Sequence, residues 1–183
     1  MRAALSFVML QLGWFACVLG AVHGRSWLGP AVVLAALALH VRLEPTTARA
    51  REVVVLAGAA VIGFLVDTAL LRNGVIVLAN APISPAWLVV LWPNVAAATA
   101  PRGTLHALAR RPRLAALLGA VAGPLAYDAG ARLGAISLDH DRLRALVIIG
   151  VAWSGVLPVF FALRLRVRDW GSMKAPPRTK GEP

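Results

Sequence analysis

Charged residues and cysteine are scarce in this sequence of 183 residues. Asp, Glu, Lys and Arg make up 15% of it, against about 25% in an ordinary soluble domain. The single cysteine, Cys17, lies inside an apolar run, which excludes an intrachain disulfide and a thiolate metal cluster. The sequence also lacks a nucleotide-binding glycine loop, a zinc helix with paired histidines and a nucleophile elbow. These absences argue against the best-defined enzyme classes, and they predict no cofactor and no metal site.

Apolar residues, by contrast, are abundant. They make up 59% of the sequence, and the mean hydropathy is +0.73. Six apolar runs are long enough, with slight extension or tilt, to cross a hydrocarbon layer about 30 Å thick. The runs cover residues 3–22, 27–41, 53–71, 87–100, 114–131 and 143–163. The sequence therefore predicts an all-α polytopic membrane protein, with a six-transmembrane helix bundle as a single domain over residues 1–170.

The basic residues are distributed unevenly among the predicted loops. The net charge is +11, and 14 of the 19 basic residues fall on the side that holds the N-terminus. The five on the other side are Arg25, Arg72, Arg132, Arg142 and Arg144. The positive-inside rule then places both termini in the cytoplasm, with a basic disordered tail over residues 171–183. Since topology explains the charge, we expect anionic lipid headgroups as partners at the cytoplasmic face, and no nucleic acid.

Prolines and glycines interrupt the last three predicted spans. Pro93, Pro124 and Pro158 lie inside helices four, five and six, and each removes a backbone donor, so these helices are expected to be kinked. Helix five also has small residues spaced four apart, which is typical of surfaces where helices approach closely. The glycines expected to pack in this way are Gly119, Gly123, Gly130 and Gly134.

A few polar side chains lie at membrane depth, where they usually face a protein interior or water. Asp67 falls about 21 Å along helix three, and either pairs with a neighbour such as Arg72 or belongs to a site. Asn94 satisfies either backbone groups freed by Pro93 or a substrate. We expect helices three and five to meet and to share one polar pocket. The candidate substrate-binding residues are Asp67, Asn94, Tyr127, Asp128 and Arg132.

A shift of 60 residues aligns segment 60–78 with segment 120–138, with 9 identities in 19 positions. This pattern indicates an internal repeat, in which helices three and five run in the same direction. Residues 75–78 are too few to span and are rich in β-branched side chains, so we expect an extended or re-entrant segment at the outer surface.

The segments GFLVDTALLRNGV, PAWLVVLWPNV and LLGAVAGPLAYDAGARLGA resemble an uncharacterised bacterial inner-membrane family, a domain of unknown function. Its pattern includes a Gly-Pro-Leu-Ala-Tyr run, which matches residues 123–127 here. The resemblance implies a small polytopic protein of the bacterial inner membrane, and it carries no known activity.

Three functions stay open at this point. The first is a non-enzymatic accessory protein in lipid or envelope metabolism, whose small-residue helix faces would contact other membrane proteins. The second is a small transporter or a substrate-binding membrane subunit, favoured by interrupted spans, the repeat and the carboxylates. The third, an intramembrane enzyme that uses Asp67, Tyr127 or Asp128 as acid or base, is less favoured because catalytic motifs are absent.

Overall fold

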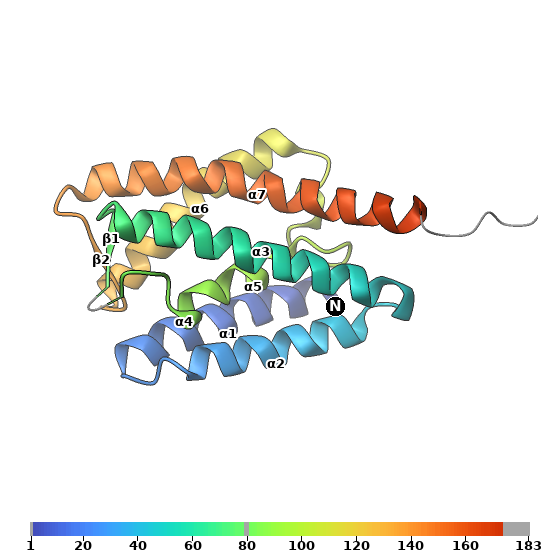
Figure 1. Cartoon of the computed structure of the whole chain (residues 1–183), viewed down its shortest axis with the longest axis horizontal. Coiled ribbons are helices and arrows are strands. Elements are labelled where there is room, and N and C mark those ends of the chain that lie inside the picture. Colours follow the sequence, from blue (N-terminus) through green and yellow to red (C-terminus); the bar gives the residue numbers. More distant parts are fainter. Residues whose placement is uncertain (1, 79–80, 174–183) are drawn as a thin grey trace, which may run out of the picture.

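The computed structural model describes residues 2–78 and 81–173 and is helical apart from one short β-ladder (Figure 1). The long helices are α1 (Arg2–Val22), α2 (Leu28–Leu43), α3 (Thr46–Arg72), α6 (Pro112–Arg132) and α7 (Arg142–Met173). The shorter elements are α4 (Ala86–Val89), α5 (Leu91–Ala98), the 3₁₀ turn η1 (His106–Leu108), β1 (Ile76–Val77) and β2 (Ser137–Leu138). Helix α7 thus enters the predicted tail, and the rest of that tail lies outside the described residues.

Helix α3 runs through the middle of the bundle (Figure 1). The antiparallel pair α1–α2 lies on one side of it, the pair α6–α7 lies on the other, and α4–α5 fills the space between α3 and α1. Helices α1, α3 and α6 run in one direction, whereas α2 and α7 return (Figure 1). We call the end where α1 and α3 begin the N-terminal end of the bundle.

Four helices, α1, α3, α6 and α7, are long and apolar enough to cross a membrane. Helix α2 and the segment Ala86–Ala98 are shorter apolar helices, so length and composition establish four of the six predicted spans. Large apolar side chains remain exposed on these helices, including Leu65 at 60%, Leu125 at 64% and Val151 at 69%. A soluble protein rarely exposes so much apolar surface, whereas a lipid bilayer covers it.

The predicted interruption of helix four is a break between α4 and α5 at Val90. A proline ring clashes with the carbonyl four residues earlier, and four residues before Pro93 is Val89, where α4 ends. Pro93 itself lies in the first turn of α5, where its missing N–H is no loss. Helices α6 and α7, in contrast, continue through Pro124 and Pro158.

The segments related by 60 residues end in the same way. Val75 N–H donates to Leu70 O at 2.9 Å after α3, and Ala135 N–H donates to Gly130 O at 3.0 Å after α6. Both turns need a left-handed residue, supplied by Gly74 (φ 68°) and Gly134 (φ 87°). Each turn leads into a two-residue strand.

The two strands pair symmetrically. They are antiparallel, with Ile76 opposite Leu138 and Val77 opposite Ser137. Val77 and Ser137 are equivalent under the 60-residue shift, so a local two-fold axis passes between them. The extended segment expected at residues 75–78 is therefore one strand of a ladder that joins the two repeats.

Candidate functional site

The Asp67 side chain is fully buried between the two repeats. Its carboxylate accepts hydrogen bonds from Trp92 Nε1 at 2.6 Å and from the Tyr127 hydroxyl. These donors satisfy the carboxylate inside the bundle, where an unpaired acid is costly. Among the described residues, Asp67 is therefore held by two aromatic side chains and not by Arg72.

The residues around Asp67 repeat the two-fold symmetry of the strands. Asp67 and Tyr127 are 60 positions apart and touch each other. Trp92 and Trp153 are 61 positions apart and stack, with ring centroids at 4.6 Å and an interplanar angle of 21°. Both pairs, like the β-ladder, thus join residues that are 60 or 61 positions apart.

A glycine makes room for each of the stacked indoles. A Cβ at Gly63 would lie closer than 3.0 Å to the Trp92 ring, and a Cβ at Gly123 would lie equally close to the Trp153 ring. Gly63 and Gly123 are again 60 positions apart. The long helices α3 and α6 thus each present a glycine, and a tryptophan from α5 or α7, respectively, lies against it.

An apolar cavity of about 80 Å³ opens beside this aromatic pair. We call it the aromatic cavity, because four of the six tryptophans in the chain line it together with the one tyrosine. Its walls include Leu10, Trp14, Val18, Trp87, Trp92, Asn94, Tyr127, Gly130 and Trp153. Asp67 lies behind Trp92 and Tyr127 and so positions two walls of the cavity without lining it.

One buried hydrogen-bond donor at the cavity is poorly satisfied. The Trp153 indole N–H has no hydrogen-bond partner of good geometry in the described part of the chain. Its neighbour, the Tyr127 hydroxyl, donates its proton to Asp67 and keeps lone pairs on the side of the indole, so it is a weakly aligned acceptor for this N–H. A buried donor without a well-formed hydrogen bond costs up to about 1–3 kcal/mol, so an acceptor brought into the cavity would improve the hydrogen bonding of Trp153.

Asp128 and Arg132 lie away from the aromatic cavity. Arg132 Nε donates to Asp128 Oδ2 at 2.8 Å, and Arg142 forms a second ion pair with the same carboxylate. Neighbouring residues on a helix point about 100° apart, so Tyr127 faces Asp67 while Asp128 faces the start of α7. The structure thus brings Asp67 and Tyr127 together and leaves the other two residues of the predicted pocket outside it.

Asn94 links two helices at the edge of the cavity. Its Nδ2 donates to Leu10 O of α1 at 3.1 Å. A Cβ at Gly13 would collide with the same amide, so α1 passes directly over it. The amide thus binds the backbone of α1, and not a carbonyl freed by Pro93 in its own helix, while Asn94 also lines the aromatic cavity.

The four glycines expected to pack against other helices have three different roles. Gly119 and Gly123 lie against Trp153 of α7 and allow the close approach expected of them. A Cβ at Gly130, however, would meet no atom within 4 Å, because that residue faces the aromatic cavity. Gly134 is not in a helix and provides the left-handed turn after α6. The packing expected for the last two is therefore corrected to a cavity wall and a helix end.

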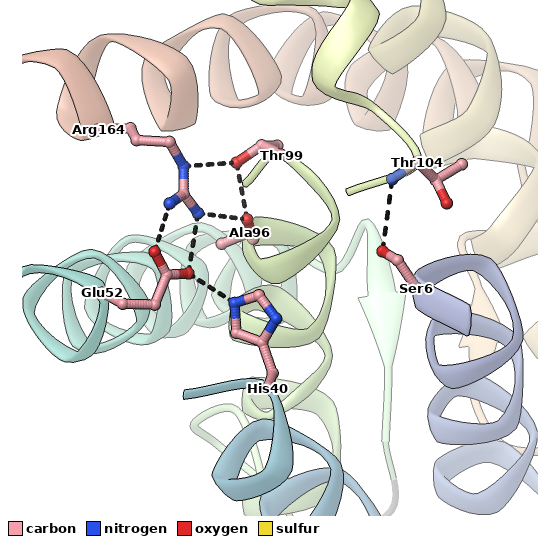
Figure 2. A network of polar contacts seen from close by, with 7 residues as sticks. All are labelled: Ser6, His40, Glu52, Ala96, Thr99, Thr104 and Arg164. Carbon is pink, nitrogen blue, oxygen red and sulfur yellow. Dashed lines mark hydrogen bonds and ion pairs between the residues drawn. The ribbon is translucent and has the colours of Figure 1, made fainter. Parts of the chain in front are cut away.

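A second polar cluster, not foreseen from the sequence, lies at the N-terminal end of the bundle (Figure 2). Glu52 of α3 is 5% exposed. His40 Nε2 of α2 lies 2.9 Å from its Oε1, and Arg164 of α7 binds both its oxygens, with Nη2–Oε1 at 3.1 Å. Arg164 also donates to Thr99 Oγ1 at 3.3 Å and to Ala96 O at 3.0 Å.

The sequence did not indicate this cluster, because α3 begins earlier than its apolar run suggested. The predicted apolar runs end at residue 41 and resume at residue 53, which places residues 42–52 in a loop, but α3 already begins at Thr46, after Pro45. Glu52 therefore falls in the second turn of the helix, where it faces the bundle interior. His40 and Arg164 lie at the ends of their own apolar runs, where basic residues are usually solvated, so neither residue indicated a buried partner.

Neither cluster resembles a metal centre. No group of three or more His, Cys, Asp or Glu side chains that could hold a metal ion occurs among the described residues. The polar atoms of both clusters are instead hydrogen-bonded to neighbouring helices, which fixes the order in which the helices pack.

Four helices long and apolar enough to cross a membrane indicate a helical multi-pass membrane protein. The chain belongs to a family described as protein of unknown function (DUF2878), whose model matches residues 3–159. The uncharacterised family expected from the sequence is thus confirmed. Searches of curated proteins and of solved structures found no match.

Proposed function

We propose that this protein binds a small, mainly apolar ligand in the aromatic cavity and acts as a substrate-binding membrane subunit or a small transporter. The observation that carries the proposal is a cavity walled by four tryptophans, with a buried indole N–H that makes no hydrogen bond of good geometry. Sites of this kind bury an apolar body and orient it through a few polar groups. The ligand should therefore carry one hydrogen-bond acceptor, such as a carbonyl oxygen.

The same geometry weakens the two competing functions. An acid–base role needs Asp67 to reach a substrate, but its carboxylate is enclosed by Trp92 and Tyr127. The accessory role was favoured by small-residue faces open to partner helices. The face at Gly119 and Gly123 is instead occupied by α7 of the same chain.

The topology that accompanies this function is six crossings of a bacterial inner membrane, with both termini in the cytoplasm. Since α1, α3 and α6 run in the same direction (Figure 1), α2 and the segment from α4 to η1 must return the chain between them. The uneven distribution of basic residues supports the orientation. A reporter fused after residue 183 tests it, because periplasmic activity of that reporter would contradict a cytoplasmic C-terminus.

Gly130 offers a direct test of ligand binding. A Cβ at Gly130 would meet no atom within 4 Å, so the side chain of Gly130→Leu should extend into the cavity and fill it while α6 stays in place. Gly155→Leu is the matched control, since a Cβ at Gly155 also meets open space and Gly155 does not line the cavity.

The readout is the set of small molecules that remain bound through purification in mild detergent, identified by mass spectrometry. We expect a compound retained by the wild type and by Gly155→Leu to be lost from Gly130→Leu. If the three proteins retain the same compounds in the same amounts, the aromatic cavity is not a ligand site.

A further inference from the structure

The aromatic cavity is open on the side of the bundle where α1 and α6 flank α5. Six of the eight residues of α5 are buried, and the two half-buried ones, Leu91 and Val95, both line the cavity. They are four positions apart, so they lie on one face of α5. The half-buried Leu10 of α1 and Ala126 of α6 line the cavity as well. We call these four residues the mouth of the aromatic cavity.

The two helices that flank the mouth leave it uncovered. Among residues 2–78 and 81–173, α1 packs mainly on α2 and α5, α6 packs mainly on α7, and α1 and α6 make few contacts with each other. Both are long and apolar enough to cross a membrane, and both expose large apolar side chains, such as Phe7 and Leu125. The mouth therefore opens sideways into the hydrocarbon layer of the bilayer and not into water.

The volume of the cavity restricts what can enter. A dry apolar cavity of about 150 Å³ admits a benzene ring, whereas this cavity measures about 80 Å³. It therefore holds one narrow group, and neither a phospholipid headgroup nor two hydrocarbon chains side by side. The rest of a longer ligand would extend over Leu91 and Val95, through the mouth, into the bilayer.

The side chains that line the cavity also restrict the charge of the ligand. No Lys, Arg or His is found among the described residues of its wall, so a carboxylate or a phosphate would be buried there without a cation, which is costly. The indole N–H of Trp153, which makes no hydrogen bond of good geometry, is a donor that a bound group could use. A neutral carbonyl oxygen meets both conditions, because it accepts a hydrogen bond and carries no charge.

We propose that the ligand is a neutral lipid with a single hydrocarbon chain, and that it enters the aromatic cavity sideways from the bilayer. Its carbonyl oxygen accepts a hydrogen bond from Trp153 Nε1, and its chain runs out through the mouth between α1 and α6. This inference rests on the proposed function, because it names the class of ligand for the same cavity and the route by which that ligand arrives.

Photolabelling in a bilayer tests the route. The full-length protein is placed in phosphatidylcholine nanodiscs with a fatty acid methyl ester that carries a diazirine at the middle of its chain, and the labelled residues are identified by mass spectrometry after illumination. We expect labelling at Leu91 and Val95 that an excess of methyl palmitate removes by competition. Labelling at Leu65, which is exposed on the surface of α3, should not be competed.

Narrowing the mouth should remove the competed labelling. Ala126→Leu adds a larger side chain on the α6 side and should lower labelling at Leu91 about tenfold. Ala122→Leu is the matched control, because Ala122 is exposed one turn earlier on the same helix and does not line the cavity. Equal labelling in these two variants would overturn the route. Val95→Phe narrows the mouth from α5 and decides the question if the size-exclusion profile shows that Ala126→Leu does not fold.

Competitors of equal chain length test the class of ligand. Methyl palmitate should compete at about fivefold lower concentration than hexadecane, which has no acceptor for the indole N–H. Trp153→Phe should remove that difference while both compounds still compete. Equal competition by hexadecane and methyl palmitate in the wild type would show that the cavity does not select a carbonyl group, and the proposed class of ligand would be wrong.

Failure of this inference and failure of the proposed function give different results. If Gly130→Leu loses a compound that the wild type retains, but no labelling at the mouth is competed, the cavity binds a ligand that does not come from the bilayer. The proposed function then stands, and this inference is wrong. If labelling is competed equally in the wild type and in Gly130→Leu, the chain lies outside the cavity, which also overturns the inference. If neither a retained compound nor competed labelling is found, both are wrong.

Discussion

Each of the two related segments has one aspartate, Asp67 or Asp128, and the 60-residue shift brings them within one position of each other. The two acids have opposite environments. Asp67 is completely buried and accepts hydrogen bonds from two aromatic donors. Asp128 lies at the edge of the bundle, where it pairs with Arg132 and Arg142. A shift of one residue turns a helical side chain by about 100°. The comparison shows that a repeated backbone can carry one interior acid and one peripheral acid.

The position equivalent to Asp67 is occupied by Tyr127, and this difference avoids a repulsion in the interior. Two equivalent aspartates meeting at the local axis would repel each other. A tyrosine in one repeat and an aspartate in the other instead form a hydrogen-bonded pair. The repeat is therefore symmetric in its backbone and asymmetric in its chemistry at the axis.

The largest effect should come from Asp67→Ala. This change leaves Trp92 Nε1 and the Tyr127 hydroxyl buried without an acceptor, at about 1–3 kcal/mol for each donor. The folded yield in mild detergent and the midpoint of thermal unfolding should both fall steeply. Asp67→Asn keeps one carbonyl acceptor and should lose less. Equal loss in both variants would mean that volume or charge, and not hydrogen bonding, holds this part of the interior.

The glycines that receive the two tryptophans should give the next effect, of similar size in both repeats. Gly63→Ala and Gly123→Ala each force an indole to move, which costs about 1–3 kcal/mol as overpacking. Gly155→Ala, where a Cβ meets open space, is the control. Thermal unfolding followed by size-exclusion chromatography gives the comparison. A large loss in only one of the two variants would break the equivalence of the repeats.

Tyr127→Phe should have an intermediate effect, because it removes one of the two donors to Asp67 and retains the ring that lines the aromatic cavity. The expected cost is about 1–3 kcal/mol. Combining Tyr127→Phe with Asp67→Ala should add little to Asp67→Ala alone, since both changes remove the same hydrogen bond. Additive losses in thermal stability would show that Tyr127 acts through another contact.

The smallest effect is expected for Asp128→Asn. The ion pairs of Asp128 lie at the edge of the bundle, where solvent and salt weaken them. The unfolding midpoint should change by little, and the difference from the wild type should shrink further in 0.5 M NaCl. A loss as large as that of Asp67→Ala would overturn the distinction between an interior and a peripheral acid.

The sequence by itself determined the class of this protein and much of its local structure. Apolar runs longer than a bilayer core have no stable alternative to helices, because every backbone group in lipid must be satisfied within its own segment. Gly74 and Gly134 mark the two helix ends, since a left-handed residue there is nearly always glycine. The spacing of 60 residues between these glycines was also readable, because it is a property of the chain alone.

Tertiary structure decided which polar residues meet. The contacts of Asp67 with Tyr127 and of Glu52 with Arg164 join residues 60 and 112 positions apart. They depend on how each helix is rotated about its own axis, which is set by the glycine surfaces and the indoles that lie against them. Local sequence does not encode that rotation, so Asp128 was indistinguishable from an interior acid until α6 and α7 were packed together.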